Sequence, residues 1–101
     1  MKVLTVRQPW ASRIIAGKKK SEFRGRPTRY RGSVAIHAGL QAERGETDEM
    51  PRGAIIGVVE IVGCRELEPG RFAWKLANPR ALKKPIPARG QLGLWNYPRD
   101  L

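Results

Sequence analysis

The chain has 101 residues and is strongly basic, with 20 Lys or Arg against 9 Asp or Glu and a formal net charge of +11 at pH 7. This length suits one domain, residues 1–101, with a modest core, and its single cysteine, Cys64, and single histidine, His37, exclude an internal disulfide and most zinc sites. We expect no signal peptide, no membrane span, no metal and no cofactor, and a cytoplasmic location where the free thiol stays reduced.

The positive charge is concentrated at one end of the sequence. Residues 1–31 contain ten Lys or Arg and one acid, Glu22, a net charge of +9, whereas the rest of the chain carries +2. A folded domain with this asymmetry is expected to attract polyanions, most often nucleic acid. The alternative is a solvated surface on a protein with an alkaline pI. We favour the polyanion because the charges cluster beside one predicted cleft.

The first predicted elements are a strand and a short helix. Lys2–Arg7 alternates as a strand does. Apolar residues then recur at helical spacing over Pro9–Ala16, and Gly17 is suited to end that helix. A helix this short must be held by tertiary packing. Trp10 is therefore favoured as a core anchor, although it could also form the edge of a pocket.

The segment from Gly17 to Arg31 carries the main candidate site. Lys20–Arg24 is predicted to be a short strand, and a loop follows it. In an extended chain, Glu22 and Arg24 point to the same side. The carboxylate would then lie within reach of ammonium and guanidinium groups on one concave surface. Such a surface suits a ligand that carries both phosphate and the polar edges of a base.

The middle of the chain predicts a strand followed by an exposed loop. Ser33–Ala38 alternates and contains His37, a possible acid or base. A lone histidine on a strand is more often a structural residue, and we favour that interpretation. Gly39–Met50 is polar and acid-rich, with Glu43 and Glu46 among its acids. We expect it to form an exposed rim.

The longest apolar run, Ala54–Cys64, is apolar on both faces and predicts a strand that is covered on both sides. Glu60 interrupts this run, and a carboxylate there is costly unless it is paired. In one interpretation it lies at a rim or in an internal ion pair. In the other it projects into a pocket and meets Lys19 or a ligand. Cys64 is favoured as a small apolar residue rather than a nucleophile.

The last part of the sequence predicts further short strands. Phe72–Leu76 alternates, and Asn78–Pro79 is expected to end that strand. Leu82–Pro87 contains two prolines and should be extended without being a central strand. Leu92–Trp95 is expected to return to the core. Together these patterns predict a mainly β (α+β) fold, a closed or nearly closed small barrel that is mostly antiparallel, with one main helix near the N-terminus.

Several short motifs occur in a specific order along nearly the whole chain. They are Leu4–Ala11; Gly17, Lys19, Glu22 and Arg24 in the spacing G-x-K-x-x-E-x-R; Tyr30–Gly32; Ile36–Ala38; Pro51–Gly57 leading to Glu60; and Gly90–Trp95. Together they resemble the ASCH domain, a member of the PUA-like superfamily. The resemblance implies a pseudo-β-barrel of five to six strands, a cleft lined by the G-x-K-x-x-E-x-R segment, and RNA binding or RNA-linked regulation.

The same resemblance leaves an enzymatic function open. Some ASCH-like proteins are small amidohydrolases that act on acylated cytidine nucleosides, with a Lys, a Thr three residues later as nucleophile, and a Glu on a later strand. Lys19 and Glu60 match two of these, but the Thr position is Glu22, which has no hydroxyl. Other relatives are nucleases, for which Lys19, Tyr30 and Glu60 could act as acid or base.

The interpretation that we favour is a domain that binds RNA, or a nucleotide-sized piece of it, in a cationic cleft. We expect Lys19, Glu22, Arg24 and Glu60 to converge there, the cations on phosphate or a base edge and the carboxylates on amino or ribose hydroxyl groups. Further candidate ligand contacts are Trp10, Lys18, Lys20, Arg26, Arg29, Tyr30 and Arg31. The alternatives are a hydrolase acting on a modified nucleoside or RNA, and a protein-interaction module that uses the acidic loop Glu43–Glu49.

Overall fold

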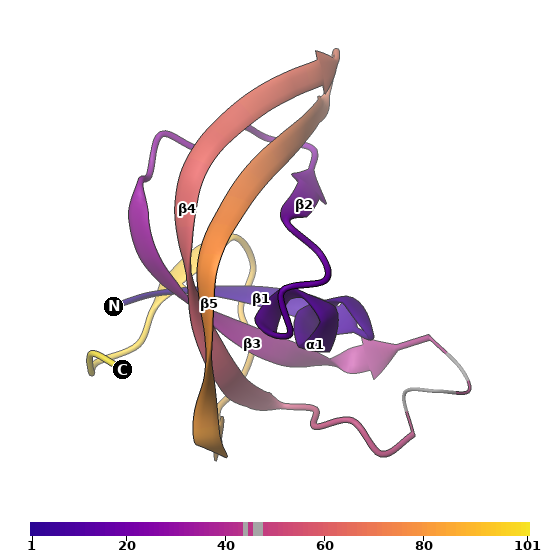
Figure 1. Cartoon of the computed structure of the whole chain (residues 1–101), viewed down its shortest axis with the longest axis vertical. Helices are drawn as coiled ribbons and strands as arrows, with labels where there is room; N and C mark the ends of the chain where they lie inside the picture. Colours follow the sequence, from indigo (N-terminus) through magenta and orange to yellow (C-terminus); the bar gives the residue numbers. More distant parts are fainter. Residues whose placement is uncertain (44, 46–47) are drawn as a thin grey trace.

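The structure is a computed structural model, and it describes residues 1–43, 45 and 48–101. It contains six strands and one helix (Figure 1). In chain order they are β1 (Lys2–Gln8), α1 (Trp10–Ile15), β2 (Ser21–Arg24), β3 (Gly32–Ala42), β4 (Ala54–Glu68), β5 (Arg71–Pro87) and β6 (Leu94–Asn96). No helix in the described part of the chain is long and apolar enough to cross a membrane.

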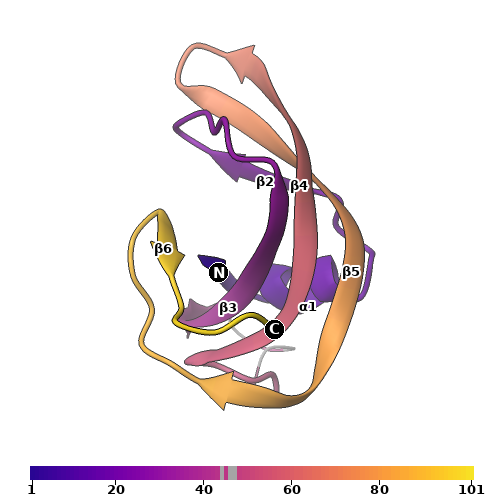
Figure 2. The same cartoon turned by 90° about the vertical axis from the view of Figure 1, so that its left-hand side faces the viewer.

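All six strands belong to one sheet with the order β2-β5-β4-β3-β1-β6. The β1–β3 pair is parallel, and the other pairs are antiparallel. The sheet curls strongly, so that its edge strands β2 and β6 lie on the same side of the curved β4 and β5 (Figure 2). This confirms the predicted fold class, a mainly β pseudo-barrel of five to six strands with an N-terminal helix.

The sheet is covered on both faces. The cluster on the face that α1 covers contains, among others, Leu4, Ile14, Ile36, Val59, Ile61 and Trp74. The cluster on the opposite face contains Val3, Ala35, Ile55, Val58 and Trp95. Strands β1, β3 and β4 contribute to both clusters, because successive side chains of a strand point to opposite faces. The expectation that Ala54–Cys64 is covered on both sides is therefore confirmed for its buried part.

Helix α1 is short and is held by specific contacts. Gln8 is fully buried, and its Oε1 accepts a hydrogen bond from the Ser12 backbone N–H at 3.0 Å, one of the donors that a helix start leaves without an intrahelical partner. The other end of α1 lies directly on the backbone of β4 at Gly57. A Cβ on Gly57 would lie 2.6 Å from Cδ1 of Ile15 and 2.8 Å from the carbonyl oxygen of Arg80.

The expectation that Asn78–Pro79 ends a strand is wrong. Strand β5 continues through these residues to Pro87, and the β4–β5 register shifts beside them. Asn78 has φ of 54°, a left-handed conformation that asparagine tolerates better than most residues. The two residues therefore form a bulge. Beyond it β5 pairs only with β4, and this free edge accommodates Pro85 and Pro87, which cannot donate to a second strand.

Candidate functional site

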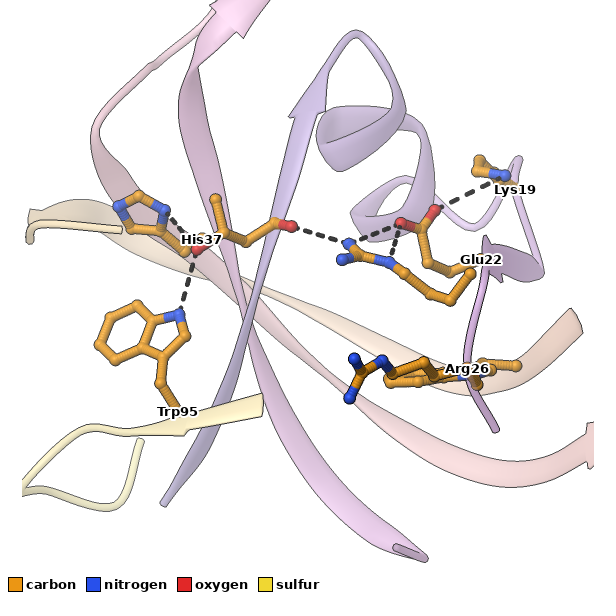
Figure 3. Close-up of polar contacts among 8 residues, drawn as sticks. Lys19, Glu22, Arg26, His37 and Trp95 are labelled. Atoms are coloured by element: carbon orange, nitrogen blue, oxygen red, sulfur yellow. Dashed lines mark hydrogen bonds and ion pairs between the residues drawn. The ribbon is translucent and has the colours of Figure 1, made fainter. Parts of the chain in front are cut away.

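Three charged side chains meet where β2 approaches β1. Glu22 is buried, and its Oε2 accepts a hydrogen bond from Arg24 Nε at 2.9 Å and forms an ion pair with Arg24 Nη2 at 2.8 Å. Arg24 Nη2 also donates to the carbonyl oxygen of Thr5 at 2.8 Å. The ammonium of Lys19 lies 3.9 Å from the other carboxylate oxygen, Oε1 (Figure 3). We call Lys19, Glu22 and Arg24 the charged cluster.

Local sequence explains why these three residues meet. Glu22 and Arg24 are two apart in β2 and therefore share a face. Lys19 lies in the tight turn that follows α1, where the backbone N–H groups of Lys18 and Lys19 both donate to the carbonyl of Arg13. Its ammonium then lies 4.6 Å from the ring centroid of Phe23, a cation–π contact. The structure brings Lys19, Glu22 and Arg24 together as expected, and their role in binding stays a prediction.

The charged cluster forms the wall of an open hollow of about 580 Å³, which we call the cationic hollow. Its lining residues are Thr5, Val6, Arg7, Trp10, Lys19, Glu22, Phe23, Arg24 and Gly25. Three cations and one carboxylate therefore face this space. Trp10 both lines the hollow and packs against the core cluster under α1, so it fulfils the two roles that its sequence position allowed.

A second hollow of about 610 Å³ lies beside the first, and we call it the seam hollow. Its lining residues are Arg24, Gly25, Arg26, Pro27, Thr28, Trp74, Leu92, Gly93 and Leu94. Because Arg24 belongs to β2 and Leu94 to β6, the two edges of the sheet face each other across this space. The pseudo-barrel is therefore open along a seam, and both hollows lie on it.

Arg24 links the two sides of the seam. Strand β6 pairs with β1 only from Lys2 to Leu4, so the next residue, Thr5, has no strand partner on that side. The guanidinium of Arg24 supplies a donor to the Thr5 carbonyl in place of the missing strand. A side chain whose charge faces the hollow thus also completes the hydrogen bonding of the sheet.

Glu60 does not join the charged cluster. Its neighbours Val59 and Ile61 both pack in the core cluster under α1, so the side chain of Glu60 points to the opposite face of β4. It lines neither hollow, and within the described part of the chain it forms no ion pair with Lys19. Glu60 is only half-buried, which lets its carboxylate reach water. The expected convergence of Glu60 with Lys19 is wrong, and we leave Glu60 out of the proposed site.

The other predicted ligand contacts divide into two groups. Arg26 is exposed and lines the seam hollow, whereas Arg29 is exposed and lines neither hollow. Tyr30 donates its hydroxyl to the Ser33 carbonyl at 2.7 Å. Arg31 donates to two carbonyls of its own loop, at 2.9 and 3.0 Å. Tyr30 and Arg31 therefore hold the loop in shape, and their contact with a ligand stays a prediction.

Both ring nitrogens of His37 have partners within the fold, which agrees with the structural interpretation favoured for it. It is buried, and its Nε2 lies 2.7 Å from the carbonyl oxygen of Ala88, which can only accept. Nε2 therefore carries the proton, and Nδ1 accepts from the Thr5 hydroxyl at 3.2 Å. That hydroxyl in turn accepts from Trp95 Nε1 at 3.0 Å. His37 and Trp95 lie on the other side of β1 from Glu22 and Lys19 (Figure 3).

Two further expectations concern acidic residues. In the described part of the chain no three His, Cys, Asp or Glu side chains gather in a way that could hold a metal ion. The acidic loop falls partly outside the described residues, and Glu46 is one of those outside. Within the described part, Glu43 Oε1 lies 3.7 Å from Arg7 Nη2.

Sequence reasoning missed three residues of the seam. Thr5 contributes through its backbone carbonyl, which has no signal in the side-chain pattern. Phe23 was passed over, although it lies between Glu22 and Arg24 in the sequence motif, contacts Lys19 and lines the cationic hollow. Leu92 was expected in the core, but it is 98% exposed on the bend before β6 and lines the seam hollow. The apolar residues that follow it, Leu94 and Trp95, do return to the core.

Comparison with known proteins agrees with this architecture. The family model described as ASCH domain matches residues 4–86. The crystal structure of ASCH from Zymomonas mobilis is 18% identical, covers 85% of this chain and 72% of its own, and superposes with a TM-score of 0.64.

Two mutants of that protein give similar values. A tyrosine-to-phenylalanine mutant has 18% identity, coverage of 85% and 74%, and a TM-score of 0.65. A serine-to-alanine mutant has 17% identity, coverage of 85% and 72%, and a TM-score of 0.64. These likenesses concern the fold alone, and a search among curated proteins found no match. Because the family model matches most of its length, the chain belongs to the ASCH domain family.

Proposed function

We propose that the chain binds RNA, or a nucleotide-sized piece of it, in the cationic hollow. The observation that carries the proposal is the charged cluster, in which one buried carboxylate holds two cations at the wall of an open space. The net charge of +9 over residues 1–31 supports the same ligand class, because it attracts phosphates from a distance. Membership of a family often linked to RNA binding supports it as well.

The cations of the cluster are positioned before any ligand arrives. Arg24 uses Nε and Nη2 for Glu22 and Thr5, and among the described residues none accepts from its Nη1. A guanidinium fixed in this way loses little side-chain freedom when it binds a phosphate oxygen. Lys19 is mostly buried along its stem, yet at 3.9 Å it is too far from Glu22 for a hydrogen bond. Its ammonium donors therefore remain open to a second anion.

Glu22 can also contact a ligand directly. Its Oε2 makes both contacts with Arg24, one hydrogen bond and one ion pair, whereas its Oε1 faces Lys19 without a short hydrogen bond. A carboxylate oxygen accepts from an exocyclic amino group or from a ribose 2′-hydroxyl. The second of these groups distinguishes RNA from DNA. The cluster therefore combines phosphate binding with an acceptor for base or sugar.

The geometry favours binding over hydrolysis. The position three residues after Lys19 is Glu22, which carries no hydroxyl and already pairs with Arg24. The Thr5 hydroxyl is held by His37 and Trp95 on the other side of β1. Glu22 therefore offers no hydroxyl nucleophile, and the Thr5 hydroxyl, although it donates to His37 Nδ1, does not lie on the same side of β1 as Lys19. Turnover of an acylated cytidine that disappears in Lys19→Ala would overturn this preference.

The test is an NMR titration of the chain with a panel of nucleosides and short single-stranded RNAs. Lys19→Ala is the test variant, and Lys18→Ala is its matched control, the same residue type one position earlier and exposed. We expect Lys19→Ala to weaken binding by roughly tenfold, about the effect of one charge-assisted contact. Lys18→Ala should weaken it by less than about twofold, and mainly at low salt.

Two results would count against the proposal. If the two variants weaken binding equally, the positive charge acts as a diffuse field and the cationic hollow has no specific role. If the unmodified chain binds no RNA or nucleotide even at low salt, the proposed function is wrong. A partner protein that binds through Glu43–Glu49, with no effect of nucleic acid, would then favour an interaction module.

A further inference from the structure

The seam hollow differs in character from the cationic hollow beside it. It has fewer charged residues on its lining, Arg24 and Arg26, and four larger apolar residues, Pro27, Trp74, Leu92 and Leu94. Leu92 is 98% exposed, the most exposed of the large apolar side chains in the described part of the chain. Trp74 is buried, and its Nε1 donates to the Arg26 carbonyl at 2.9 Å. The indole therefore presents carbon surface to the hollow rather than a free donor.

Arg24 lies at the boundary between the two hollows and lines both of them. On one side of it lie the other cations of the cationic hollow, and on the other side lie the apolar residues of the seam hollow. A nucleotide has the same division, because an anionic phosphate is joined to a flat base with large apolar faces. We propose that the seam hollow binds the base of a nucleotide whose phosphate lies against Arg24. This inference rests on the proposed function and adds the position of the base.

The charges around the seam hollow favour a nucleotide over a purely apolar occupant. Arg24 and Arg26 both lie on its lining, so an occupant that carries phosphates on either side of the base is complementary in charge. Thr28 lies on the same lining, and its hydroxyl accepts from the Tyr30 N–H at 3.1 Å, which leaves the hydroxyl proton for another acceptor. An acyl chain or apolar peptide would leave both arginines without a counter-charge.

The expected ligand is single-stranded. A base can enter the hollow only if its faces and edges are free of stacking and pairing, which is the usual condition for recognition of bases in RNA. Contact of bases with apolar and aromatic side chains tolerates different sequences, because every base has an apolar face. The seam hollow, at about 610 Å³, is roomy, which also favours weak sequence preference.

The test compares a short single-stranded RNA with its abasic analogue, which has the same number of phosphates but no bases. The test variant is Leu92→Ala, and its matched control is Leu40→Ala, a second exposed leucine (77%) that lines neither hollow of the seam. We expect Leu92→Ala to weaken binding of the RNA by about three- to tenfold, because an apolar contact with one base is lost. Binding of the abasic strand should not change, and Leu40→Ala should behave as the unmodified chain.

Each other outcome overturns the inference in a recognisable way. If Leu92→Ala leaves RNA binding unchanged while Lys19→Ala still weakens it, the base lies elsewhere and the proposed function stands. If Leu92→Ala weakens the abasic strand as much as the RNA, Leu92 acts on the shape of the site and not on a base. If the unmodified chain binds neither strand, both the base position and the proposed function are wrong. Since Leu92 is almost fully exposed, its truncation should leave the thermal midpoint unchanged, and this confirms that binding alone is compared.

Discussion

Replacement of Arg24 by alanine should destabilise the fold far more than is usual for an arginine that lines an open hollow. The guanidinium makes three short contacts, two with Glu22 Oε2 and one with the Thr5 carbonyl. Its removal leaves a buried carboxylate whose nearest remaining cation, Lys19, is 3.9 Å away. It also leaves the Thr5 carbonyl on the open edge of β1 without its donor.

The magnitude follows from the burial of the pair. Removal of one partner from a fully buried ion pair costs about 3–5 kcal/mol. The side chain of Glu22 is 11% exposed and that of Arg24 is 28% exposed, so water screens part of the interaction. We therefore expect Arg24→Ala to lower the free energy of unfolding by about 2–4 kcal/mol. A domain of this size has about 5–15 kcal/mol of stability, so the variant should still fold.

The assay is urea unfolding followed by tryptophan fluorescence, with a midpoint lowered by about 1–3 M in Arg24→Ala. Arg26→Ala is the matched control. Arg26 lies two positions after Arg24 and is exposed, so its replacement should shift the urea midpoint little. The double variant Arg24→Ala with Glu22→Gln should be more stable than Arg24→Ala alone, since a neutral amide does not need a cation. Equal midpoints for Arg24→Ala and Arg26→Ala would refute the argument that Arg24 compensates a buried charge.

Three other predictions follow from the packing and the charge. Gly57→Ala should lower the free energy of unfolding by about 1–3 kcal/mol in the same assay, because the new Cβ would lie 2.8 Å from the Arg80 carbonyl oxygen. Gly63→Ala is the control and should lower it much less, because its Cβ would lie 3.6 Å from the nearest atom. Equal losses would show that the close approach of the Arg80 carbonyl to Gly57 does not limit the substitution. Glu60→Gln should leave RNA affinity unchanged, because Glu60 points away from the seam, and a sharp loss would return it to the site. In a plot of the logarithm of RNA affinity against the logarithm of salt concentration, the slope should be about −0.7 for each phosphate contacted. An affinity that does not change with salt would exclude an electrostatic interface.

The sequence was sufficient to predict the fold class and the pairing of Glu22 with Arg24. Both depend on short-range periodicity, which strand geometry converts directly into faces. Asn78–Pro79 misled the strand assignment because those residue types usually end strands, whereas here β4 supports β5 across a bulge. Only the pairing of β5 with β4 on both sides of the bulge decides whether the strand ends there or continues.

The position of Glu60 could not be predicted for a different reason. A single charge in an apolar run predicts that it has a partner. The strand has two faces, however, and the local sequence pattern does not say which face lies toward Lys19. The register of β4 settles this, because it places Val59 and Ile61 under α1 and turns Glu60 away. The role of Thr5 was hidden for a related reason, since its carbonyl is open only because β6 begins at Leu94, which pairs with Leu4.

The arrangement of strands also has a consequence for the order in which the chain assembles. Strands β4 and β5 are neighbours in sequence, joined by a tight turn at Pro69–Gly70, and they share the largest interface of the fold. A hairpin of this kind closes a short loop and can form early. The pairing of β1 with β6 joins opposite ends of the chain and must wait until the rest of the sheet exists. The β1–β6 pair beside the seam is therefore expected to form last in folding and to open first in native-state hydrogen exchange. A ligand bound in the seam hollow would slow exchange at β1 and β6 more than in the β4–β5 hairpin.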